Sequence, residues 1–144
     1  MRATRRTMLL GLIAIGAAAC VQGKLVHTAA FEVTYEARSN LDRALQAWAL
    51  SERFKIGSAG DPSSVYWPAW TFTSDDIDIS IAPMNEEPAT VDAPPPRGPL
   101  AYAAQFYDHS ALGGAARLPA VIASFTRTLS AVDGVRKLRD DQAA

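Results

Sequence analysis

The chain has 144 residues, of which 49% are hydrophobic and 20% are charged, a composition that excludes a disordered tail and fits one globular domain. Its formal net charge is −1, yet all 15 acidic residues lie after position 30, while Arg2, Arg5 and Arg6 crowd the beginning of the chain. The single cysteine, Cys20, excludes a disulfide within the monomer and any metal site built from several cysteines.

The first 19 residues have the three parts of a secretory signal peptide. A short basic segment precedes an uncharged apolar run, Met8 to Ala19, which ends in three alanines. This run has 12 residues, too few for a membrane-spanning helix, which needs roughly 20. We therefore expect residues 1–19 to be a signal peptide. The adjacent Arg5 and Arg6 are compatible with the general export route and with a twin-arginine route.

The segment Ala17-Ala18-Ala19-Cys20 resembles the lipobox of bacterial lipoproteins, with Ala17 where that family usually has leucine. The resemblance implies that Cys20 is acylated and becomes the first residue of the mature chain. Burial of acyl methylene groups, at about 0.8 kcal/mol each, would then anchor the protein in a membrane. The two residues after Cys20 include no aspartate, which by the same resemblance favours the outer membrane. The alternative is an ordinary signal-peptidase cut after Ala19, which leaves Cys20 unmodified.

After the export segment the chain carries 11 basic and 15 acidic residues, a net charge of −4. This acidic balance, together with export, argues against nucleic acid as a partner. We expect residues 20–29 to form a lipidated N-terminus with a short tether. Residues 30–144 should form one domain, with a proline-rich loop at 85–99.

Periodicity predicts the secondary structure of that domain. Alternating apolar and polar residues indicate strands over 31–36, 77–81 and 100–106, and shorter or aromatic runs indicate strands over 54–56, 65–72 and 135–139. Apolar residues at helical spacing indicate helices over 41–53 and 118–132. We predict an α+β fold, a two-layer sandwich in which two helices cover one face of a mostly antiparallel sheet of four to five strands.

Four aromatic residues lie close together in the run 65–72. On a strand, Tyr66, Trp70 and Phe72 would share one face and Trp67 would point to the other. Four aromatic side chains in so short a run are more than a single strand face can bury. We therefore expect Tyr66, Trp67 and Trp70 to be candidates for contact with a partner. The alternative for Trp67 is packing beneath the three prolines at 94–96.

No motif in the sequence identifies a reaction, a metal or a cofactor. The first functional hypothesis is therefore a non-catalytic envelope lipoprotein that faces the periplasm and binds or scaffolds a membrane or envelope partner. The second is a small-ligand or metal-binding domain, or a weak hydrolase. It would need acidic residues from two segments and one histidine to gather in space: Asp75, Asp76, Asp78, Asp108 and His109.

Overall fold

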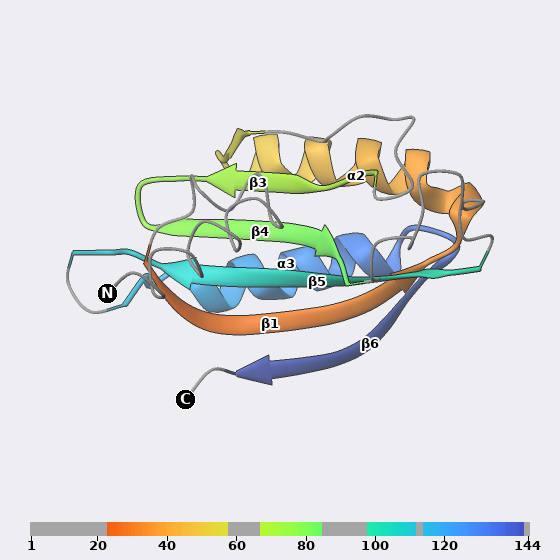
Figure 1. Ribbon diagram of the computed structural model, residues 1–144. Helices are drawn as coiled ribbons and strands as arrows, with labels where there is room; N and C mark the ends of the chain where they lie inside the picture. Colours follow the sequence, from red (N-terminus) through yellow and green to blue (C-terminus); the bar gives the residue numbers. More distant parts are fainter. Residues whose placement is uncertain (1–22, 58–66, 85–97, 112–113, 143–144) are drawn as a thin grey trace, which may run out of the picture.

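The computed structural model describes residues 23–57, 67–84, 98–111 and 114–142, so Cys20, Tyr66 and nearly all of the predicted proline-rich loop lie outside the described residues. Within them, six strands form one antiparallel sheet in the order β2-β3-β4-β5-β1-β6, with helices packed against one face (Figure 1). The predicted α+β class is confirmed. The sheet has six strands, slightly more than the four to five expected.

The elements follow one another along the chain in the predicted order. The strands are β1 (Lys24–Val33), β2 (Lys55–Ile56), β3 (Trp70–Thr73), β4 (Ile77–Pro83), β5 (Leu100–Asp108) and β6 (Val135–Gln142). The helices are α2 (Arg38–Ser51) and α3 (Leu118–Ser130), and a single 3-10 turn, η2 (Tyr35–Ala37), precedes α2. None of the described helices is long and apolar enough to cross a membrane.

The core lies between the helices and the sheet. Each helix turns an apolar stripe inward because its hydrophobic residues recur every three or four positions. In α2 the stripe centres on Leu45 and Trp48, and in α3 it centres on Phe125, whose ring packs edge-on against those of Phe31 and Phe106. The alternating isoleucines of β4 complete this layer and are fully buried. The apolar face of the hairpin formed by β3 and β4 therefore lines the core on the side of the sheet.

The expected tether is shorter than predicted, because β1 already begins at Lys24. This strand lies between β5 and β6, so both of its edges form ladder hydrogen bonds. His27, which the sequence placed in the tether, is only 6% exposed and packs its ring against Phe106. A register shift between Leu25 and His27 breaks the regular alternation of this strand and conceals it in the sequence.

The strand predicted over 65–72 is displaced toward the C-terminus. In the structure β3 begins at Trp70, two residues after Pro68. A proline has no backbone N–H to donate to a ladder, so the pairing with β4 starts only beyond it. The ladder then pairs Trp70 with Ile81 and Thr73 with Asp78, as a hairpin requires.

Candidate functional site

All five residues of the ligand-binding hypothesis come to one end of the sheet, with Asp75 in the turn there and the other four near one another. The ladder between β4 and β5 places Ile77 opposite Asp108, so the turn that carries Asp75 and Asp76 lies next to the end of β5. The backbone N–H of His109 donates to the carbonyl oxygen of Asp76 at 3.0 Å, which ties the two segments together. Asp76, Asp78, Asp108 and His109 are thus near one another in space despite their separation in sequence.

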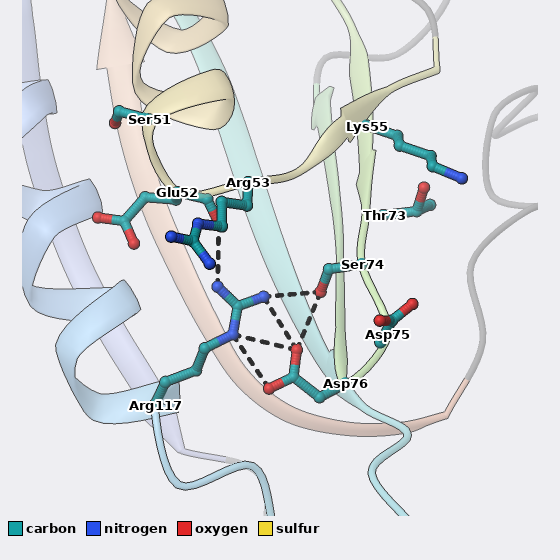
Figure 2. A pocket seen from close by; sticks show the side chains of 9 residues that line it. All are labelled: Ser51, Glu52, Arg53, Lys55, Thr73, Ser74, Asp75, Asp76 and Arg117. Carbon is teal, nitrogen blue, oxygen red and sulfur yellow. Dashed lines mark hydrogen bonds and ion pairs between the residues drawn. The ribbon is translucent and has the colours of Figure 1, made fainter.

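Asp76 is held by Arg117, which lies just before α3 (Figure 2). The guanidinium Nε donates to both carboxylate oxygens, at 3.1 and 3.0 Å, and a terminal nitrogen donates to Oδ1 at 2.9 Å. The same terminal nitrogen donates to Ser74 Oγ at 2.8 Å, and the other donates to the carbonyl oxygen of Glu52 at 3.0 Å. The hydrogen bond from Arg117 holds the pKa of Asp76 below its ordinary value, although partial desolvation opposes it.

This clamp joins three segments that are distant in sequence. The guanidinium of Arg117 connects the start of α3 with the end of α2 and with the β3–β4 turn, and its carbon lies 5.0 Å from the centroid of the Phe54 ring. Four of the five N–H donors of Arg117 are engaged in these contacts. Its first role is therefore structural. No motif in the sequence indicates this role, because the partners lie 41 and 65 residues away.

Asp78 and His109 form a second, separate pair. Asp78 Oδ1 lies 3.1 Å from Nε2 of His109, and it also accepts from the backbone N–H of Ser74 at 3.3 Å. The Asp78 side chain is 4% exposed and the histidine ring 21%. The alternation of apolar and polar residues over 77–81 predicts that Asp78 and Ser80 face solvent, opposite the isoleucines. That prediction is wrong, because both residues are buried.

Asp108, His109 and Ser110 are adjacent in sequence but belong to two networks. One oxygen of Asp108 accepts from the Ser110 hydroxyl at 2.6 Å, and the other accepts from the backbone N–H of Ala115 at 2.7 Å. These hydrogen bonds, the Ser110 hydroxyl first, lower the pKa of Asp108. Because His109 turns instead to Asp78, the three side chains do not form the relay of hydrogen bonds that a hydrolytic triad needs.

A cleft of about 640 Å³ opens beside the Arg117 clamp, between the end of α2 and the β3–β4 turn. Arg53 and Lys55 on its wall are exposed and form no ion pair within the described residues. Arg53 also has a positive φ of 65°, which a non-glycine residue rarely adopts. Figure 2 shows Lys55 pointing away from Arg117, with Asp75 on the same side of the view as Lys55. The cleft therefore offers free cationic groups and one carboxylate for a charged ligand.

Metal binding receives no support from the arrangement of side chains. In the part of the chain that the structure describes, no group of three or more histidine, cysteine, aspartate or glutamate residues is placed to hold a metal ion. Three of the carboxylates that the sequence suggested as ligands, Asp76, Asp78 and Asp108, instead accept hydrogen bonds from Arg117, from Ser110 and from backbone amides.

The aromatic residues that the sequence suggested as partner contacts differ in their burial. Trp70 is a core residue, not an exposed contact: its side chain is fully buried, and its indole N–H donates to Asp42 at 2.9 Å. Trp67 is half-buried, and its carbonyl oxygen accepts from the buried Arg38 at 2.9 Å. The guanidinium of Arg38 also lies 3.7 Å from the ring centroid of Tyr35, which is 39% exposed. Trp67 thus remains available at the surface, while Tyr66 lies outside the described residues.

The sequence matches no protein-family model and no curated protein.

Proposed function

We propose that this protein is an exported, lipid-anchored component of the bacterial envelope whose α+β domain is a non-catalytic docking module. The proposal depends on one observation above all: the only cysteine of the chain stands directly after an apolar run that ends in three alanines. Acylation of Cys20 would attach the chain to a membrane, with the outer membrane favoured and the domain facing the periplasm.

The start of β1 sets how far the domain can lie from that membrane. Three residues, at positions 21 to 23, separate Cys20 from Lys24. A fully extended chain rises by roughly 3.3 Å per residue, so this link spans about 10 Å. A domain held so close would meet partners that are themselves embedded in or bound to the same membrane.

The environment of the polar side chains supports docking rather than catalysis. Asp76 and Asp108 are engaged in hydrogen bonds that hold loops together, and Arg117 serves Asp76. Arg53 and Lys55, on the wall of the cleft, form no ion pair with another described residue, and their long cationic side chains suit an acidic segment of a partner. Trp67 offers a second contact of the kind that protein interfaces favour.

Lipidation is tested by mass spectrometry of the mature N-terminus and by fractionation of cells on a density gradient. We expect the wild-type chain to begin at an acylated Cys20 and to sediment with outer membranes. The Cys20→Ala variant should lose both properties, and Val21→Ala, the matched control, should keep them. An unmodified Cys20 at the N-terminus of the wild-type protein would refute the anchoring part of the proposal.

Docking is tested by photo-crosslinking in intact cells. A photoreactive residue at position 53, in the cleft, should give discrete adducts with envelope proteins, and Lys55→Ala should weaken them. The same residue at position 127, on the exposed side of α3, is the control and should give none of these adducts. Equal adducts from both positions would contradict a role for the cleft.

The buried Asp78–His109 pair favours a second candidate, the ligand-binding or weakly hydrolytic domain. A buried carboxylate that orients a partly exposed histidine is an arrangement that general bases use. Activity of the purified protein on a panel of activated esters, lost in His109→Ala and retained in the Ser110→Ala control, would support this candidate. Equal rates for the wild type and His109→Ala would eliminate it.

A further inference from the structure

The strand β6 forms an open edge of the sheet. Within the described residues its only strand neighbour is β1, and Figure 1 shows it at the outer edge, beside the C-terminus of the chain. The strand has eight residues, and those from Arg136 to Asp141 are all exposed. An exposed edge strand of this length can pair with another strand because one row of its backbone donors and acceptors is unused.

The charges along β6 change sign at its middle. The sequence from position 136 reads Arg-Lys-Leu-Arg-Asp-Asp, so a basic half precedes an acidic half. Charged edge strands normally resist pairing, because an incoming strand sets unfavourable charges opposite one another. An antiparallel second copy of this strand does the reverse. It brings the acidic half of one copy opposite the basic half of the other.

A bulge in β6 makes this pairing possible on both faces of the sheet. Opposite residues of an antiparallel pair must lie on the same face, which in a regular strand would exclude Arg136 from pairing with Asp141, five positions away. In the ladder with β1, however, the register shifts so that Leu138 is passed over. Arg136 then lies opposite Glu32 and Asp141 opposite Thr28, and Glu32 and Thr28 share one face of β1.

The same shift aligns the inner pair of charges. Lys137 lies opposite Phe31 and Asp140 opposite Ala29, which together occupy the face that carries the helices. One register therefore sets opposite charges against each other on both faces. It places Arg136 opposite Asp141 of the second copy and Lys137 opposite Asp140 of the second copy, and the symmetry repeats each pair. The same register places Arg139 opposite its own copy at the twofold axis, so one like-charge pair stands against four pairs of opposite charge.

We propose that two copies of this protein associate through β6, antiparallel and about a twofold axis perpendicular to the sheet. The two sheets become continuous, and the helices of both copies lie on the same side. Within one copy Arg136 pairs with Glu32, Arg139 pairs with Asp141, and Asp140 pairs with Lys137 and with the buried His27. The first two pairs are exposed, so they contribute little and can rearrange. The proposal goes beyond the proposed function, since it requires neither acylation nor an envelope partner.

Charge reversals at the two ends of the strand test both the pairing and its register. We expect the full chain, purified in detergent, to sediment as a dimer in ultracentrifugation at matched solvent density. Arg136→Asp sets aspartate opposite Asp141, and Asp141→Arg sets arginine opposite Arg136, so each variant alone should associate at least tenfold more weakly. The double variant R136D/D141R restores opposite charges and should dimerise again.

Mixing the two single variants gives the sharpest result. A tagged Asp141→Arg chain carries two arginines where the Arg136→Asp chain carries two aspartates, so the mixture should form a heterodimer that co-purifies on the tag. A tagged and an untagged Asp141→Arg chain should not co-purify, which controls for shared micelles. Arg43→Asp, on the exposed side of α2, makes the same charge change away from β6 and should leave the dimer intact.

A wild-type chain that remains monomeric at the highest concentration reached would overturn the proposal, and would leave this edge to a different protein. Dimers that persist unchanged in both single variants, or a mixture that fails to associate while each variant keeps the wild-type melting temperature, would overturn it as well. Circular dichroism of each variant separates these outcomes from misfolding, because Arg136 and Asp141 are 71% and 58% exposed and their replacement removes no core contact.

Discussion

Replacement of Arg117 by alanine should destabilise the protein by about 2 to 3 kcal/mol at neutral pH. The side chains of Arg117 and Asp76 are 35% and 29% exposed, so solvent screens their ion pair, which is worth about 1 kcal/mol. The hydrogen bonds to Ser74 Oγ and to the Glu52 carbonyl oxygen add about 1 kcal/mol each. Arg117→Lys should recover little of the loss, since one ammonium cannot reach the acceptors in both the β3–β4 turn and the end of α2.

The loss of stability caused by Arg117→Ala should become smaller as the pH falls. The pKa of Asp76 is lower in the folded protein than its ordinary value of 3.8, which the unfolded chain retains. The contribution of the ion pair to stability is therefore complete above pH 3.8 and disappears as the pH falls through the lower, folded-state pKa. The difference between wild type and Arg117→Ala should shrink by about 1 kcal/mol between pH 7 and pH 2.

Urea denaturation followed by tryptophan fluorescence measures both effects. Arg127→Ala serves as the control, because Arg127 is exposed on α3 and no ion pair joins it to another described residue, so its loss should cost less than about 1 kcal/mol. A cost below about 0.5 kcal/mol for Arg117→Ala, or a cost that stays the same from pH 7 to pH 2, would refute the assignment of Arg117 as the clamp of this end of the sheet.

Three further substitutions test the packing by the same denaturation assay. Trp70→Ala should lower the free energy of unfolding by about 3 to 5 kcal/mol, because the ring is fully buried; a change near zero would contradict this burial. Tyr102→Phe should leave the free energy of unfolding unchanged or raise it by up to about 1 kcal/mol, because no described residue forms a hydrogen bond with the buried hydroxyl; a clear loss would reveal a partner. Gly134→Ala should cost about 1 to 3 kcal/mol, since φ is 85° and the new Cβ would lie 2.6 Å from Thr34 Oγ1, whereas Gly98→Ala, with open space around it, should cost less than half as much.

The site at the end of the sheet contains side chains held by hydrogen bonds and, beside them, side chains free to bind a partner. The clamp made by Arg117 and the pairing of Asp78 with His109 fix the turn and the loop around the cleft. Arg53 and Lys55 lie on the wall of the same cleft and form no ion pair among the described residues. Charged groups held on a fixed backbone lose little further freedom when they bind, which suits a docking surface.

Much of the fold could be predicted from the sequence because it follows from local periodicity. The isoleucines of β4 alternate, and the apolar residues of α2 and α3 recur at helical spacing, so each segment shows which side it buries. These patterns also determined the order of the elements and the two-layer α+β class. Local pattern failed where tertiary partners override it: His27 is polar, yet β1 is a strand because β5 and β6 pair with it on both sides.

The sequence by itself determined the contrast in composition along the chain, with a basic and apolar stretch before Cys20 and an excess of acidic over basic residues after it. Only the tertiary structure decided which side chains meet. Trp70 and Asp78, which the sequence predicted to be exposed, are buried. Arg117, which belongs to no sequence motif, forms the central hydrogen bonds at one end of the sheet. The reason is physical. Hydrophobic periodicity is a property of neighbouring residues, whereas hydrogen bonds between residues 41 or 65 positions apart exist only once the sheet has brought those segments together.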